Sequence, residues 1–354
     1  TSGRVMNTIR VDPVTTRNLE ISRVLESVAS HASCGPARER ILAFEASMNG
    51  SELRKRRARV SETMLLCSPA GDQGPGLPPS LDLAFLDELE TLFSRLERGG
   101  TLDGEEILEV TALIGPLVTL SDLVTRHSES LEALHQLMAD RSLASGGTLE
   151  GLKRIALEVD ASLDESGQVK DSASPELRRL RRKAVDLRGY LSARAQQLVL
   201  KHAEHLQDDF FTIREDRYVL PVRSDSRRGV PGIIHGSSNS GATLFIEPHV
   251  LVEDCNELKV LEGEIHAREN EILEELSRAL SRHVDGLRRT HQALVEMDIL
   301  LAIARFALVV EGGYPELVDE PVLDLKSARH PLLVQAGVDV VPNDVAIRSG
   351  TGWG

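Results

Sequence analysis

The sequence predicts a mostly helical protein in which two long helices run out to a small β-rich tip and back. Three observations support this prediction. Residues 177–206 hold one apolar stripe at helical spacing, the pattern turns to strict alternation at Phe210, and helical spacing returns after Pro248. Apolar side chains three and four positions apart share a helix face, whereas alternating ones share a strand face. The two changes of pattern therefore mark the ends of a β unit between helices.

Residues 1–147 are predicted to form a helical core domain. Helical spacing covers residues 17–67, 81–98, 104–126 and 129–144. Glycine and proline content predicts a loop at 70–79, a kink or a split of the helix at Gly115-Pro116 and a joint at Gly146-Gly147.

Residues 148–209 are predicted to form an ascending arm. Its long helix should begin at Ser174-Pro175-Glu176, which supplies a capping hydroxyl, a proline at the first position and an acid in the first turn. The apolar stripe that follows would be roughly 50 Å long at 1.5 Å per residue. Its members are Leu177, Leu180, Ala184, Leu187, Leu191, Ala195, Leu198, His202 and Leu206.

Residues 210–248 are predicted to form the tip. Alternating β-branched and aromatic residues mark four strands at 210–214, 217–223, 232–236 and 242–246, with short polar turns between them. Strands this short and this close in sequence predict a small antiparallel unit.

Residues 249–312 contain no proline and are predicted to return as a long helix. Gly263 and Gly286 weaken its middle without ending it, so an unbroken helix would span roughly 90 Å. The stretch Met297–Val310 is apolar nearly all round and should be buried in the core domain. Antiparallel pairing of the two long helices would bury both of their stripes.

The charges of the two helices are complementary. Residues 175–205 carry eight lysines and arginines against three acids, whereas 251–298 is rich in glutamate. Pairing between the helices explains the arginine run at 178–183, and a phosphate-binding patch is the alternative.

The composition excludes several classes of protein. A net charge of -14 repels nucleic acid at long range, so any such contact needs a local basic patch. Three scattered cysteines give neither a disulfide framework nor a zinc site, and residues 1–10 lack the apolar core of a signal peptide. The longest apolar run, 299–310, is too short to span a membrane. We therefore expect a cytoplasmic protein without a membrane partner.

Residues 313–354 are predicted to start a second sheet. Residues 322–325 and 338–341 have strand character, with a turn at 342–344, and the sheet is expected to lack its further strands. Gly350 and Gly352 do not form a phosphate loop, because no Gly-x-x-x-x-Gly-Lys-Ser/Thr occurs in the chain.

The tip holds the best candidate binding residues. Arginines and small polar groups on a protruding unit suit backbone phosphates, with Ser237–Ser240 as further donors. The alternative is an ordinary polar surface, because four acids nearly cancel the charge. The candidate nucleic-acid-binding residues are Arg214, Arg217, Arg223, Arg227 and Arg228.

No catalytic or metal-binding residue is predicted. His202 and His205 lie near Asp208 and Asp209, but a solvated helix face explains them better than a metal site. No nucleophile elbow or Ser/His/Asp order is found.

Specific strings in the chain resemble the second branch of the MutS family. Residues 164–179 read DESGQVKDSASPELRR, 212–222 read TIREDRYVLPV, and 236–248 read GSSNSGATLFIEP. Residues 19–26, 328–333 and 341–344 also fit the family.

The resemblance implies a helical lever domain, long antiparallel helices carrying a small antiparallel β clamp, and the first strands of a truncated α/β ATPase domain. It implies a homodimer that closes on nucleic acid under the control of ATP and Mg²⁺, without a mismatch-reading domain. Val340, Val341, Pro342 and Asn343 match the segment that lies against adenine. The phosphate loop, the magnesium-binding acid and a nuclease domain are expected beyond Gly354, so this chain is not expected to bind these cofactors well or to hydrolyse ATP.

Three functions follow as hypotheses. The first is a clamp on branched DNA that restrains recombination. The second is a ribosome-binding module of a factor that rescues stalled ribosomes, with ribosomal RNA as the ligand. The third is a helical scaffold without affinity for nucleic acid.

Overall fold

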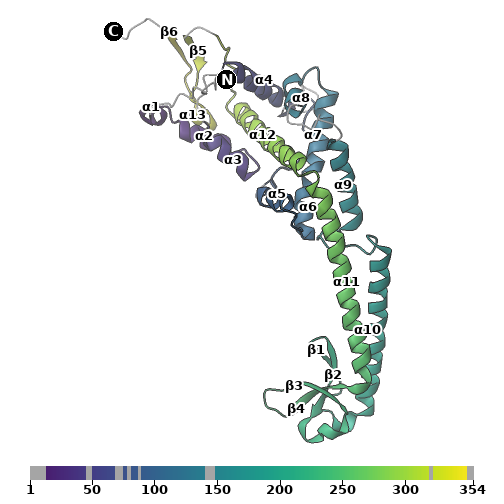
Figure 1. Cartoon of the computed structure of the whole chain (residues 1–354). Helices are drawn as coiled ribbons and strands as arrows, with labels where there is room; N and C mark the ends of the chain where they lie inside the picture. Colours follow the sequence, from purple (N-terminus) through teal and green to yellow (C-terminus); the bar gives the residue numbers. More distant parts are fainter. Residues whose placement is uncertain are drawn as a thin grey trace. The chain divides into compact units, whose positions relative to one another are not determined.

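A computed structural model describes residues 13–44, 50–67, 75–77, 81–86, 89–139, 148–318 and 322–348. The chain is mostly helical with small antiparallel sheets, as predicted. It divides into two compact units (Figure 1). Unit 1 comprises residues 1–100, 106–157 and 279–354, and unit 2 comprises 101–105 and 158–278. The predicted joint at Gly146-Gly147, the glycines at 350 and 352, and most of the predicted loop at 70–79 lie outside the described residues.

Unit 1 is built around the helix α12 (Val284–Val309), whose middle is buried on all sides. The preceding helices are α1 (Pro13–Asn18), α2 (Ile21–Ala29), α3 (Gly35–Leu42), α4 (Gly50–Cys67), α5 (Leu89–Glu97), α6 (Gly104–Ala112), α7 (Ile114–Arg126), α8 (Glu132–Met138) and α9 (Thr148–Ser162). Asp298 of α12 is fully buried and accepts hydrogen bonds from the backbone N–H groups of Ser33 (2.8 Å) and Cys34 (2.9 Å). These bonds satisfy two donors at the start of α3 and fix it to α12.

The core domain confirms one expectation and corrects another. The helix predicted at 104–126 is split near Gly115-Pro116, because α6 and α7 are separated by Leu113. Pro116 lies in the first turn of α7, where its missing N–H costs nothing. The second expectation needs correction. The stretch Met297–Val310 is buried only as far as Phe306, because Leu308 and Val309 are about half exposed.

Residues Gly104–Arg126 are long and apolar enough to cross a membrane by length and composition. Their apolar side chains Ile107, Val110, Leu117 and Leu120 are fully buried in this structure, which is the usual position of such residues in a core helix.

The returning helix is broken. α11 (His249–Ser281) ends two residues before α12, with Arg282 and His283 between them. Ser281 Oγ donates to the Leu96 carbonyl at 3.0 Å, and the His283 ring lies so close to Gly151 that a Cβ there would be 2.7 Å from it. The prediction of one continuous helix over residues 249–312 is therefore wrong. The helix is interrupted at neither Gly263 nor Gly286.

The C-terminal segment forms a two-stranded antiparallel sheet from β5 (Val322–Ala328) and β6 (Asn343–Arg348). The strand predicted at 338–341 and the turn at 342–344 are wrong. α13 (Pro331–Gln335) ends with Gly337 at φ 70°, and the Val338 N–H caps it by donating to the Leu333 carbonyl. Val338 is used by this helix end and is not available for a strand.

Unit 2 pairs α10 (Pro175–Lys201) with α11 in antiparallel fashion (Figure 1). Ser174 caps α10 as predicted, because its Oγ accepts from the Leu177 N–H. α10 is shorter than the apolar stripe: His202 is its C-cap, and Leu206 packs instead with the sheet.

Four cross-helix ion pairs confirm the predicted charge complementarity. They are Arg181–Glu269 at 2.7 Å, Lys183–Glu257 at 2.7 Å, Arg188–Glu262 at 2.6 Å and Arg194–Asp254 at 3.8 Å. Arg178, Arg179 and Arg182 are exposed and form no ion pair with any residue that the structure describes. Pairing thus explains part of the arginine run.

The turn before α10 packs against the start of α6 by a close approach of two glycines. Gly167 has φ 79°, and a Cβ there would lie 2.6 Å from the Glu105 nitrogen. A Cβ on Gly104 would lie 1.8 Å from the Gly167 carbonyl oxygen. Only glycine fits at this crossing.

We predict that Gly167→Ala lowers the free energy of unfolding of unit 2 by about 1–3 kcal/mol, because it adds a clash to a left-handed backbone. Gly263→Ala is the matched control: a Cβ there meets nothing within 4 Å. Alanine in a helix should stabilise α11 by about 0.5–1 kcal/mol. Chemical denaturation followed by circular dichroism measures both. Equal stability of the two variants would contradict the prediction.

Candidate nucleic-acid interface

The tip is a four-stranded antiparallel sheet with strand order β1-β2-β4-β3. Its strands are β1 (Thr212–Arg214), β2 (Arg217–Arg223), β3 (Gly232–Ser237) and β4 (Thr243–Pro248). All four lie within the predicted tip, so the β unit stands where α10 ends and α11 begins (Figure 1).

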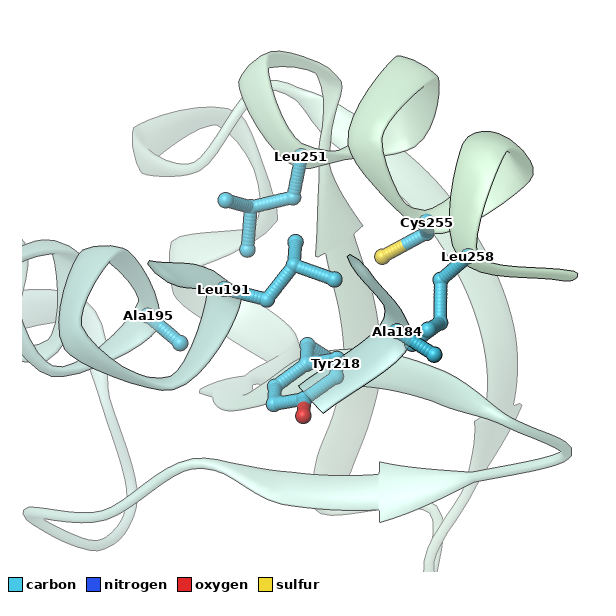
Figure 2. Packing of buried hydrophobic residues seen from close by; sticks show 7 residues of the cluster. All are labelled: Ala184, Leu191, Ala195, Tyr218, Leu251, Cys255 and Leu258. Carbon is cyan, nitrogen blue, oxygen red and sulfur yellow. The ribbon is translucent and has the colours of Figure 1, made fainter. Parts of the chain in front are cut away.

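An apolar cluster fixes this sheet to both helices. Figure 2 shows Tyr218 of β2 with Leu191 of α10 and Leu251 and Leu258 of α11 around it. Burial raises the pKa of the Tyr218 hydroxyl, which keeps its proton and lies 3.5 Å from the carbonyl of Arg188. The tip should therefore move together with the helix pair.

A buried carboxylate organises the sheet from within. Glu247 of β4 is 1% exposed, and its Oε1 accepts a hydrogen bond from Arg217 Nη1 at 3.3 Å. The same Arg217 nitrogen donates to Asn256 Oδ1 at 2.7 Å. Its Oε2 lies 2.6 Å from His235 Nε2. Burial raises the pKa of the nearby Cys255 thiol, and the charge of Glu247 raises it further. The candidate residue Arg217 is thus held in the fold as a charge partner.

The five candidate arginines differ in the contacts that their guanidinium groups make within the protein. Arg223 donates from Nη2 to the Glu204 carbonyl at 2.6 Å. The guanidinium of Arg214 lies 3.4 Å from the centre of the Phe245 ring, which leaves its other face open. Arg227 and Arg228 are exposed on the short helix η3 (Ser224–Gly229) and have no ion-pair or hydrogen-bond partner in the described part of the chain.

η3 is held in place at both ends. Arg223 precedes it, and Gly229 at its end lies against the ring of His205, where a Cβ would be 2.4 Å from the ring atoms. This contact fixes the turn that carries Arg227 and Arg228. Two free guanidinium groups on one fixed turn suit the phosphates of a nucleic-acid backbone.

The loop between β3 and β4 carries the predicted small donors. Ser238 Oγ accepts from the Thr243 N–H at 3.1 Å and lies 3.3 Å from Ser240 Oγ. Asn239 and Ser240 remain exposed, and Gly241 has φ 70° at the turn. The polar face that was predicted from Ser237–Ser240 is therefore partly used to close the loop.

Two histidines lie near the tip, at the end of α10 and in the 3-10 turn after it. His202 and His205 have ring centres 6.4 Å apart, and burial lowers the pKa of His202, with Lys201 lowering it further. Among the described residues, no group of three His, Cys, Asp or Glu side chains is placed to hold a metal ion.

The segment predicted to lie against adenine is mostly exposed. Val341 is 76% exposed, and Asn343 Nδ2 donates back to the Val341 carbonyl at 3.3 Å. Val340 is half-buried and Pro342 is exposed. The side chains of Val340, Val341 and Pro342 are apolar, and the contact of this segment with adenine stays a prediction.

Sequence reasoning missed the residues that support the tip. Glu247 counts in the sequence only as one of the four acids of a polar surface, whereas the structure buries it. The sequence does not indicate the roles of His235, Asn256 and Phe245. The signal was present for Glu247 alone: a carboxylate in an otherwise apolar strand end, Phe-Ile-Glu-Pro, requires a buried partner.

No family model matches the chain. Proteins named "Endonuclease MutS2" do match it. The chain is 34% identical to the one from Symbiobacterium thermophilum over 95% of this chain and 40% of that protein. It is 30% identical to the one from Pelotomaculum thermopropionicum over 95% of this chain and 41% of that protein. It is 29% identical to one from Clostridium perfringens over 90% of this chain and 38% of that protein. The chain spans about two fifths of the length of these curated relatives.

We predict that Glu247→Ala destabilises the tip by about 3 kcal/mol, because it leaves Arg217 without its buried partner. Glu257→Ala is the control: it breaks the pair with Lys183, in which both side chains are about half exposed, and should cost about 0.5 kcal/mol or less. Urea denaturation gives both values. A Glu247→Ala protein as stable as the control would show that the buried pair does not hold the sheet.

Proposed function

Because this chain is a MutS2-like member of the MutS family, we propose that it is the lever-and-clamp part of a nucleic-acid clamp. The single observation that supports this most is the pair Arg227 and Arg228, exposed and unpaired within the described structure on a support fixed to the helix pair. In this proposal they bind backbone phosphates without reading sequence or mismatches.

The other three arginines take different roles in this proposal. Arg214 adds a stacked guanidinium next to the contact, whereas Arg217 and Arg223 position the strands and η3 through Glu247 and the Glu204 carbonyl. A guanidinium already bonded inside the protein has fewer donors left for a phosphate.

We propose DNA as the ligand, and branched DNA in particular, with restraint of recombination as the outcome. The relatives are named endonucleases, a class of enzyme that acts on nucleic acids. Ribosomal RNA has the same backbone chemistry, so the ribosome-rescue role is the competing outcome of the test below.

The remaining functions belong to the whole protein and are also proposals. ATP with Mg²⁺ would drive closure of a homodimer in the cytoplasm. In this proposal Val340–Asn343 would lie against the adenine. The residues that bind the phosphates and Mg²⁺ would belong to a part of the whole protein other than this chain. A bound nucleotide supplies the free energy for closure, and this chain transmits it through its helices.

We predict that the double change Arg227→Gln and Arg228→Gln weakens binding to a four-way DNA junction roughly tenfold at low salt. The slope of log K against log salt should fall by about 0.9 for each phosphate that the variant no longer neutralises. Fluorescence anisotropy over a series of salt concentrations measures both.

The matched control is Lys183→Gln with Arg278→Gln, which removes the same charge from helix positions that are already paired with acids. An unchanged slope in the Arg227/Arg228 variant would exclude the tip as the contact. Loss of binding to ribosomal RNA, with junction binding unaffected, would favour the ribosome as the partner.

A further inference from the structure

Arg214 and Phe245 form a stacked pair on the tip. The guanidinium carbon of Arg214 lies 3.4 Å from the centre of the Phe245 ring. At this separation the guanidinium plane must lie nearly parallel to the ring, because a tilted group would push a nitrogen into the ring carbons. Arg214 belongs to β1 and Phe245 to β4, and β2 lies between these strands in the sheet. The Arg214 side chain therefore extends across the sheet to cover this ring.

The backbone fixes the strand end that carries Arg214. Arg214 is the last residue of β1 and pairs with Arg217 of β2, so only Glu215 and Asp216 connect the two strands. These two residues have φ 48° and 62°, and a two-residue turn with both φ positive matches the twist of a hairpin. Arg214 is thus held at its backbone by the hairpin and at its guanidinium by the ring, so it gives up little conformational entropy on binding a ligand.

The outer face of this guanidinium is available to a ligand. Arg214 is exposed and Phe245 is half-buried. Arg214 forms no ion pair or hydrogen bond with any residue of the ranges that the structure describes. Because the ring covers one face of the guanidinium, the exposed surface consists of its opposite face and its edge.

The charges around Arg214 favour a neutral ligand over a phosphate. Glu215 and Asp216 follow it in the turn, and both are exposed. Asp216 has Lys259 as a distant ion-pair partner at 3.8 Å. A phosphate at this end of the hairpin would be repelled by two carboxylates, whereas a neutral flat group would not.

We infer that the Arg214 guanidinium, stacked on Phe245, binds an unpaired nucleobase of DNA by stacking. The inference rests on the proposed clamp function and adds to it a preference for DNA with unpaired bases. Nucleobases stack on aromatic rings and on arginine planes. Such stacking accepts every base, because every base has a flat π-face. In a duplex the bases already stack on their neighbours, so only branch points, gaps, loops and ends offer a free face.

The test is Arg214→Lys in the intact chain, which keeps the positive charge and removes the flat group. One ligand is a DNA duplex with a loop of unpaired thymidines, and the other carries an equal number of abasic sites in the loop, with the same phosphates. We expect the unaltered chain to bind the thymidine loop roughly fivefold more tightly than the abasic loop. Arg214→Lys should bind both loops equally, which fluorescence anisotropy measures.

Arg194→Lys is the matched control. The guanidinium carbon of Arg194 lies 5.6 Å from the centre of the Tyr190 ring on α10, so the same change is made at another arginine–aromatic contact of unit 2. This variant should keep the preference for the thymidine loop. Thermal denaturation followed by circular dichroism checks that both variants are folded.

The Arg227/Arg228 variant separates this inference from the clamp function. Equal affinity of the unaltered chain for the two DNA loops, or a preference that survives in Arg214→Lys, would overturn the inference. The clamp function still stands in that case if the Arg227/Arg228 variant binds both loops more weakly. If Arg214→Lys loses the preference while the Arg227/Arg228 variant binds like the unaltered chain, the base site stands and the phosphate contact at η3 fails.

RNA duplexes with a uridine loop and with an abasic loop form the second arm of the experiment. They offer the same unpaired base with a 2′-hydroxyl on its sugar. A base preference that occurs with RNA and not with DNA would overturn DNA as the source of the base.

Discussion

The seam between α10 and α11 is the contact on which the rest of unit 2 depends. Its apolar residues come from both helices and from Tyr218 of the sheet, so the same cluster joins the helices to each other and to the tip. The ion pairs along its sides are partly exposed and add little stability each, but they oppose any shift in helix register. The hydrophobic contact thus supplies the stability, and the charges set the alignment.

The tip contains two kinds of charged group: buried ones that support the sheet, and exposed ones that are available to a ligand. Glu247 holds Arg217 and His235 inside the sheet, and a buried carboxylate is tolerated only because both of its oxygens have partners. The buried charges are paired with each other in this way, so the exposed arginines Arg227 and Arg228 of η3 are not needed as their partners. A rigid sheet with a satisfied interior can keep Arg227 and Arg228 oriented toward a ligand, so that little conformational entropy is given up on binding.

The elements set by local chemistry could be predicted from the sequence, and those set by distant contacts could not. Ser174 and Pro175 define a helix start within three residues, and the tip strands follow from alternation. The break at His283 depends on Gly151, more than a hundred positions earlier, and the role of Arg217 depends on a partner in another strand. The strand pattern at 338–341 predicts the wrong structure because the Val338 N–H is bound to the Leu333 carbonyl at the end of α13.

A net charge of -14 and a nucleic-acid ligand are compatible because screening limits the range of the acidic surface. At physiological salt the Debye length is about 8 Å, so an approaching phosphate experiences mainly the groups within that distance. At η3 those groups include Arg227 and Arg228, which have no ion-pair or hydrogen-bond partner among the described residues. Acidic surface elsewhere then weakens non-specific association, and the backbone is held where the arginines lie. Binding of this kind is short-ranged and readily reversed, which suits the proposed clamp, because that function requires release of the ligand.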